Sequence, residues 1–310
     1  MTPPLRYQPG SDPTEMIEEW LARPALRAMV EASSGTWPSG GLQSRLDQLV
    51  EFSSVWDRRN GDSRLAITAT ERSYGQSEQV LGWAAALGLV DVAAPSGRDV
   101  DTALVLGGLV TGCVSRVDYL RDLMKNGRVH VEQIALLGSF RQLQDQEREL
   151  ADEVAPGATT EVDVLMALGA DLDPRSASWD VTSTGDPVTD PRGAELAVHR
   201  GEQPSTWVFA ARSSDPGARP ANTADTYRQA ASALRFGAGT RLLLVTTHIY
   251  ATYQHWDAVR VLGLPLGVEL ETIGTPPGAS RRVFSSDWYA QEVRSTLRSA
   301  RALVMAWAEG

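Results

Sequence analysis

The sequence predicts an α/β protein with a mainly parallel sheet, helices on both faces of that sheet, and a helical N-terminal part. Two observations carry this prediction. Short apolar runs alternate with longer segments of helical periodicity, as in sheets whose parallel strands are joined by helices. Four of these runs, at residues 102–106, 133–137, 206–211 and 241–246, are mostly apolar, which indicates strands buried on both faces. Residues 268–273 are expected to form a further strand.

The first part of the chain, residues 1–98, is expected to be a helical N-terminal region. After an arm at residues 1–14, apolar side chains recur at helical spacing, and Leu42, Leu46 and Leu49 share one face. The helices expected in this region cover residues 15–21, 42–50 and 77–87.

The second part, residues 99–310, is expected to form the α/β domain. Its strands alternate with helices at residues 115–125, 225–236 and 287–308. The stretch 171–190 is rich in Asp, Pro, Ser and Thr, which predicts a loop or lid.

The composition excludes several classes of protein. The chain of 310 residues carries a net charge of −10 and no Lys/Arg-rich block, which argues against a nucleic-acid partner. The single cysteine, Cys113, excludes an intrachain disulfide and a multi-cysteine metal site. The most apolar run, 80–94, is interrupted by Gly82, Gly88 and Asp91 and is too short to span a bilayer. We therefore expect a soluble, cytoplasmic protein that binds no membrane; a homodimer is compatible with these features.

Polar residues follow the first two predicted strands of the α/β domain. Ligands of open parallel sheets bind beyond the carboxyl ends of the strands. Gly107 and Gly108 end the first strand, with Arg116 on the next helix, and Ser139 ends the second. Glu161 opens a later apolar helix. Each has a second interpretation: the glycines and Ser139 as an ordinary turn, Arg116 as an exposed helical arginine, and Glu161 as a helix cap.

A second set of polar candidates follows the later strands. Asn222, Thr223 and Asp225 open a helix, and any of them could serve only as a cap. Arg212 precedes them in a loop, and its cation could balance the candidate carboxylates. His248 follows the strand 241–246, and Tyr250 lies beyond it; both could equally be packing residues. No histidine has metal-ligand spacing, so we expect no histidine-based metal site.

These features occur in an order that resembles the DUF218 (YdcF-like) family, in divergent form, over residues 100–275. The likeness rests on Gly107-Gly108 with a downstream Arg116, Gly138-Ser139, Glu161 at a helix start, Asn222-Thr223, and the strand ending at Thr246-Thr247. Where that family has a His and an Arg, this chain has Tyr250 and Tyr253, with His248 displaced by two positions. The resemblance implies a Rossmann-like fold with a polar, catalytic cleft, and S-adenosylmethionine as one associated ligand.

Three functional hypotheses follow. The first is an enzyme, a hydrolase or transferase, that acts on a small phosphorylated or nucleotide-like substrate. In it Glu161, Asp225 and His248 are the catalytic candidates, and Gly107, Gly108, Arg116, Ser139, Arg212, Asn222, Thr223 and Tyr250 bind the substrate. The second is a binding protein, without catalysis, for S-adenosylmethionine or another nucleoside. The third is an interaction protein whose cleft has degenerated. The cofactor is unknown, and S-adenosylmethionine and a divalent ion are both compatible with the sequence. A divalent ion is compatible because Mg²⁺ needs only one or two carboxylate ligands from the protein.

Overall fold

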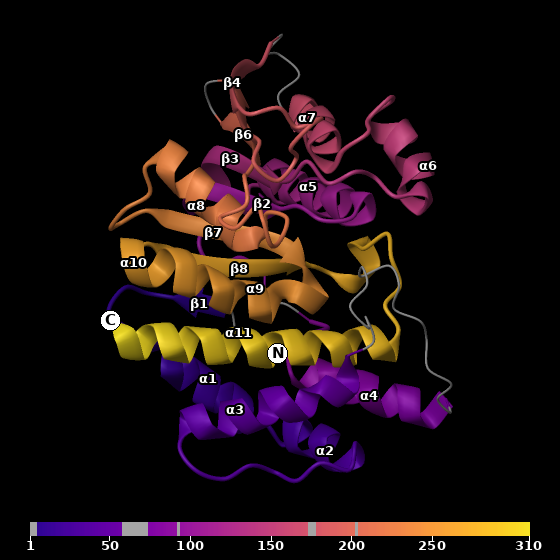
Figure 1. Cartoon of the computed structure of the whole chain (residues 1–310), viewed down its shortest axis with the longest axis vertical. Coiled ribbons are helices and arrows are strands. Elements are labelled where there is room, and N and C mark those ends of the chain that lie inside the picture. The colour runs from indigo at the N-terminus through magenta and orange to yellow at the C-terminus, as the bar shows by residue number, and fades with distance from the viewer. Residues whose placement is uncertain (1–4, 58–73, 92–93, 173–177, 202–203) are drawn as a thin grey trace.

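The computed structural model describes residues 5–57, 74–91, 94–172, 178–201 and 204–310. Its centre is a sheet of eight strands in the order β1-β8-β7-β2-β3-β6-β5-β4 (Figure 1). Adjacent strands among β8, β7, β2, β3 and β6 pair in parallel. Their bounds are β2 Asp99–Leu106, β3 His130–Gly138, β6 Ser205–Ala210, β7 Arg241–Thr247 and β8 Glu269–Thr275. The mixed α/β class and the mainly parallel sheet expected from the sequence are confirmed.

The parallel strands are buried on both faces. Along β2, Leu104 and Leu106 pack into one apolar core, while Ala103 and Val105 pack into the other. Helices α5 (Val110–Lys125), α6 (Asp145–Val154) and α7 (Glu161–Leu172) belong to the second core. Helices α8 (Thr223–Leu234) and α9 (Ala251–Ala258) cover the opposite face, and the short α10 (Leu264–Leu266) follows α9. In β2 and β3 the residues of the C-terminal half are buried one after another, which explains why those stretches are apolar without alternation.

Three strands at the sheet edges were not expected. β1 (Leu5–Tyr7) pairs antiparallel with β8, in the stretch where the sequence indicated only an arm. At the other edge, β5 (Glu195–Arg200) pairs antiparallel with β6, and β4 (Asp180–Thr184) pairs with β5. β4 lies inside the stretch interpreted as a loop or lid, part of which (173–177) is outside the described residues. All five residues of β4 are exposed, so no apolar pattern marks it in the sequence.

The N-terminal helices form a further layer. They are α1 (Pro13–Leu21), α2 (Pro24–Ala32), α3 (Leu42–Phe52) and α4 (Tyr74–Ala86). Helices α1, α3 and α4 pack on α11 (Ser286–Glu309), and α2 packs on α4. α11 contacts α9 on its other side, so it lies between this layer and the sheet (Figure 1). Trp20 of α1 makes an edge-to-face contact with Trp256 of α9, and its indole N–H donates to the Leu87 carbonyl over 3.0 Å. The two parts of the chain therefore share one apolar core.

The chain order of the parallel strands reverses between β2 and β7. From β2 the chain proceeds outward through β3 to β6, and then it returns to β7 and β8 on the other side of β2. Connections leave in opposite directions at such a point, and a crevice opens at the carboxyl ends of the strands. Within the described ranges, none of the helices combines the length and apolar character that crossing a membrane requires.

Candidate functional site

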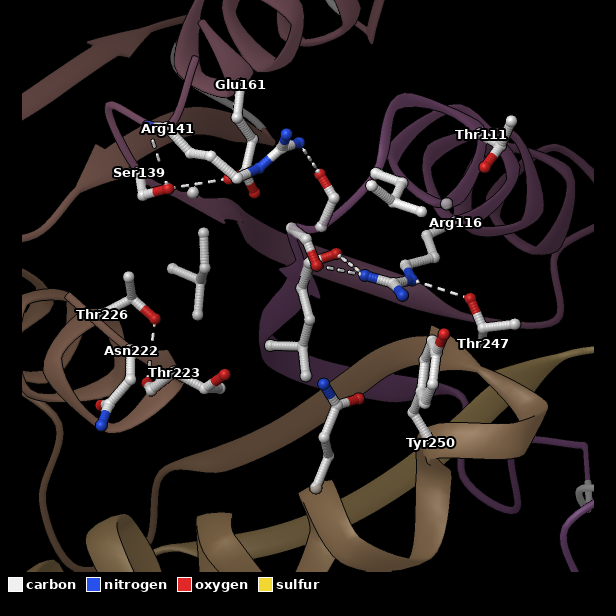
Figure 2. A pocket seen from close by; sticks show the side chains of 18 of the residues that line it. Thr111, Arg116, Ser139, Arg141, Glu161, Asn222, Thr223, Thr226, Thr247 and Tyr250 are labelled. Carbon is white, nitrogen blue, oxygen red and sulfur yellow. Dashed lines mark hydrogen bonds and ion pairs between the residues drawn. The ribbon is translucent and has the colours of Figure 1, made fainter. Parts of the chain in front are cut away.

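A cavity of about 410 Å³ lies at the carboxyl ends of β2, β3 and β7, where the strand order reverses. The first turns of three helices border it, through Thr111 of α5, Glu161 of α7 and Thr223 of α8 (Figure 2). The first N–H groups of a helix have no carbonyl partner within it, and the helix dipole adds positive potential there. Three such termini around one cavity favour an anionic ligand.

Glu161 is the buried carboxylate of this cavity. Its side chain is 7% exposed, and Oε2 accepts a hydrogen bond of 2.8 Å from the Ser139 hydroxyl at the end of β3 (Figure 2). Burial raises the pKa of Glu161 above its usual range, although Arg141, Ser139 and the backbone N–H of Gly108 act in the opposite direction. A carboxyl group with a raised pKa keeps its proton to higher pH than a free glutamic acid, which suits a group that exchanges protons with a substrate.

Arg141 links Glu161 to a second buried carboxylate. Its guanidinium lies 3.6 Å from Glu161 Oε2, donates to Glu147 over 2.7 and 3.1 Å, and donates to the Gly108 carbonyl over 2.8 Å. Glu147 also accepts from the backbone N–H of Val110 and of Gln144, at the starts of α5 and α6. Burial tends to raise the pKa of Glu147, but these donors hold it below its usual value. Arg141 and Glu147 thus fix the loops that surround Glu161.

Arg116 supplies a buried cation beside the partly exposed Arg141. It is 3% exposed on α5, and its guanidinium donates to the carbonyls of Leu106 and Gly107 and, over 3.1 Å, to the Thr247 hydroxyl. These bonds join the ends of β2 and β7 across the point of strand reversal. Gly107 must be small here, because a Cβ atom would lie 2.1 Å from Glu161 Oε1.

Aromatic side chains form the opposite wall of the cavity. Tyr250 lies between Tyr253 and Phe284, with a ring-centroid distance of 6.0 Å to each. The Arg116 guanidinium carbon is 5.8 Å from the Tyr250 ring centroid, and that of Arg282 is 4.1 Å from the ring of Trp288. The cavity therefore has a charged end at Glu161 and Arg141 and an aromatic end that could receive a flat ring.

Along nearly its whole length the chain is similar to uncharacterized mycobacterial proteins. It is 31% identical to Rv3785 of Mycobacterium tuberculosis strain H37Rv, over 97% of this chain and 93% of that protein. The identity and coverage are the same for Mb3814 of Mycobacterium bovis. The chain belongs to the Rv3785 family. The family model described as the Rv3785 N-terminal domain matches residues 8–88. No solved structure matches the chain significantly.

Membership of the Rv3785 family corrects the resemblance to DUF218, which was wrong. The family model that matches is the Rv3785 N-terminal domain and not DUF218, and the relatives are uncharacterized Rv3785 proteins. The features that suggested it recur for general physical reasons. Asn222 and Asp225 form a capping box at the start of α8, in which each side chain accepts from the backbone N–H of the other residue. Glycine turns and helix caps of this kind follow buried parallel strands in unrelated proteins.

Eight of the residues that the sequence singled out line the cavity of this Rv3785-family protein, and three do not. Gly107, Gly108, Arg116, Ser139, Glu161, Asn222, Thr223 and Tyr250 border it. Asp225 lies outside the cavity, where its carboxylate pairs with Arg219 over 2.6 Å. Burial tends to raise the pKa of Asp225, but Arg219 and the backbone N–H of Asn222 lower that pKa to about 2. His248 is buried, with Nδ1 3.0 Å from the Thr275 carbonyl and Nε2 3.2 Å from the Tyr289 hydroxyl. Arg212 has a 70% exposed side chain that lies 3.9 Å from Glu195.

The cavity also contains residues that the sequence did not single out. Arg141 is two residues beyond Ser139 in the turn after β3, and its partner Glu147 could have drawn attention as the third residue of a capping box. Arg282 and Phe284 come from the loop between β8 and α11, which carries no periodic pattern. Among the described residues, no group of three or more His, Cys, Asp or Glu side chains is arranged to hold a metal ion.

Proposed function

We propose that the cavity is the active site of an enzyme that acts on a small phosphorylated or nucleotide-like substrate, as a hydrolase or transferase. The observation that carries this proposal is Glu161, a buried carboxylate with a raised pKa on a cavity wall that also holds Arg116 and Arg141. Proton transfer to and from the substrate needs a group with such a pKa, and a phosphoryl group needs cations beside it.

The order of the parallel strands supports a Rossmann-like interpretation of the fold, because their spatial order, 3-2-1-4-5 when numbered along the chain, matches five of the six strands of that fold. In this proposal residues 99–310 are the catalytic domain and residues 1–98 a helical N-terminal region. Glu161 is the general acid or base, Arg141 and Arg116 balance the charge of the phosphoryl group, and Asn222 and Thr223 contact the substrate from α8. Asp225 and His248 have no role in it, since their side chains are engaged elsewhere.

A screen of ligands tests the proposal directly. Nucleotides, sugar phosphates and S-adenosylmethionine would be added to the protein, and its thermal unfolding recorded. A ligand at a hundredfold excess over its Kd stabilises the folded state by about 2.7 kcal/mol. Product analysis of each stabilising compound then separates an enzyme from a binding protein. If no phosphorylated or nucleoside compound stabilises the protein or is converted, the proposal is wrong.

Glu161→Gln is the variant that tests catalysis, because glutamine keeps the shape and can still accept from Ser139. We expect it to bind the ligand and to lower turnover by about 10²–10⁴-fold, the usual contribution of general acid-base catalysis. Glu149→Gln on α6 is the matched control, since Glu149 is exposed and should leave turnover unchanged. Arg116 is a poorer choice, because its loss would also release the carbonyls of Leu106 and Gly107.

A second candidate function is a non-catalytic binding protein for S-adenosylmethionine or another nucleoside. The aromatic wall of Tyr250, Tyr253 and Phe284 supports it, because a nucleoside base can stack on such a surface. This alternative predicts stabilisation by the nucleoside without any product, and equal stabilisation of the wild type and Glu161→Gln.

A further inference from the structure

The hydroxyl of Ser139 has two defined hydrogen bonds at the floor of the cavity. It donates to Glu161 Oε2 over 2.8 Å and accepts from the backbone N–H of Arg141 over 3.3 Å (Figure 2). Ser139 directly follows β3, is only partly buried and lines the cavity. A hydroxyl that donates to a carboxylate is oriented to lose its proton to that carboxylate.

The carboxylate is itself held in place by a third group. Arg141 lies 3.6 Å from the oxygen that accepts from Ser139, and the N–H of Gly108 also bonds Glu161. Nucleophilic active sites share this arrangement, in which a nucleophile contacts a base and the base is fixed by another residue.

The other serine and threonine hydroxyls of the cavity lack this arrangement within the described part of the chain. Thr226 donates to the Thr223 carbonyl over 2.9 Å, and Ser280 donates to the Arg282 carbonyl over 3.1 Å. Thr247 accepts from Arg116. Of the serine and threonine hydroxyls that line the cavity in the described ranges, Ser139 is the one with a carboxylate acceptor.

We propose that Ser139 is the nucleophile of this site and forms a phosphoserine intermediate, with Glu161 as its base. The inference rests on the proposed enzymatic function and specifies its chemistry. Ser139 Oγ bonds to phosphorus as the bond from phosphorus to the leaving oxygen breaks. The hydroxyl proton passes to Glu161, which delivers it to the leaving oxygen. Glu161 then takes a proton from water, or from an acceptor alcohol, whose oxygen attacks phosphorus. The bond from phosphorus to Oγ breaks, and Glu161 returns the proton to Ser139.

A fluorophosphonate probe tests the nucleophile without knowledge of the substrate. Its phosphorus bonds to a reactive serine oxygen, the bond to fluorine breaks, and fluoride leaves with the hydroxyl proton. The full-length protein would be incubated with diisopropyl fluorophosphate and its intact mass followed over time. We expect one adduct per chain, located on Ser139 by peptide mass spectrometry, and no adduct on Ser139→Ala.

Two further variants separate a reactive serine from an accessible one. Glu161→Gln should lower the rate of labelling by about 100-fold, because the base is lost while the hydroxyl stays in place. Ser280→Ala removes a second serine from the same cavity and should be labelled like the wild type. The labelling rate of the wild type should also rise with pH as Glu161 loses its proton.

The outcomes distinguish this inference from the proposed function. Absence of labelling, or labelling that persists in Ser139→Ala, would overturn the assignment of Ser139 as the nucleophile. Turnover of a phosphorylated ligand by Ser139→Ala at the wild-type rate does the same, yet it leaves the proposed function intact, with Glu161 acting on water. Failure of every ligand to bind or react would instead contradict the proposed function itself.

Discussion

Replacement of Gly107 by alanine tests how tightly the end of β2 fits against Glu161. The added Cβ atom would lie 2.1 Å from Glu161 Oε1 and 2.3 Å from the Leu137 carbonyl oxygen. The carbonyl is backbone of the neighbouring strand, and it already accepts from the Gly107 N–H over 2.6 Å. Relief of the clash therefore requires the strand ends to separate. Overpacking of this kind costs about 1–3 kcal/mol, and a weakened backbone hydrogen bond adds about 1 kcal/mol.

We therefore expect Gly107→Ala to lower the free energy of unfolding by about 3 kcal/mol, measured by urea denaturation with an unchanged slope. Gly82→Ala is the matched control. Gly82 is exposed within α4, and an added Cβ would meet nothing within 4 Å. It should stabilise the protein by up to about 1 kcal/mol, because alanine is the better helix former. A Gly107→Ala protein that unfolds within about 0.5 kcal/mol of the wild type would refute the close packing of Gly107 on Glu161.

Three further predictions concern the buried carboxylates and the contact between the two parts of the chain. Glu147→Gln should destabilise the protein by about 3 kcal/mol in urea, because it breaks a buried ion pair, whereas Asp145→Asn on the same helix should stay within about 0.5 kcal/mol. For Glu161, a raised pKa means that its contribution to stability is present at acid pH and is lost as pH rises through that pKa. Glu161→Gln should therefore gain stability relative to the wild type between pH 4 and pH 8, as followed by unfolding at each pH, and a pH-independent difference would contradict this. Trp20→Ala should cost about 3–5 kcal/mol while circular dichroism and tryptophan fluorescence still report one transition; two separate transitions would show that the N-terminal helices unfold alone.

Most of the parallel strands could be predicted from the sequence, because burial on both faces makes their C-terminal halves apolar. The edge strands could not. β4 is exposed at every position, and β1 spans three residues of which only Tyr7 is buried. A strand of this kind is defined by its partner and carries no signal of its own.

The candidate site was predictable in position but not in the direction of its side chains. Topology brings the ends of β2 and β3 together, so Gly107 and Ser139 meet as the sequence indicated. His248 also follows a parallel strand, yet its ring turns toward the Thr275 carbonyl. Which way a polar side chain points depends on partners from distant segments. The hydrogen bond between Ser139 and Glu161 likewise joins residues from distant segments, and no spacing in the sequence predicts it.

The position of α11 bears on how the chain is synthesised. This helix follows every other described element in chain order, yet α1, α3 and α4 pack against it. The N-terminal helices leave the ribosome first, and their apolar faces remain without their principal partner until α11 has been translated. Domains usually fold in order as they emerge, and exposed apolar surface invites aggregation in the interval. The N-terminal layer can therefore complete its packing only after α11 has left the ribosome.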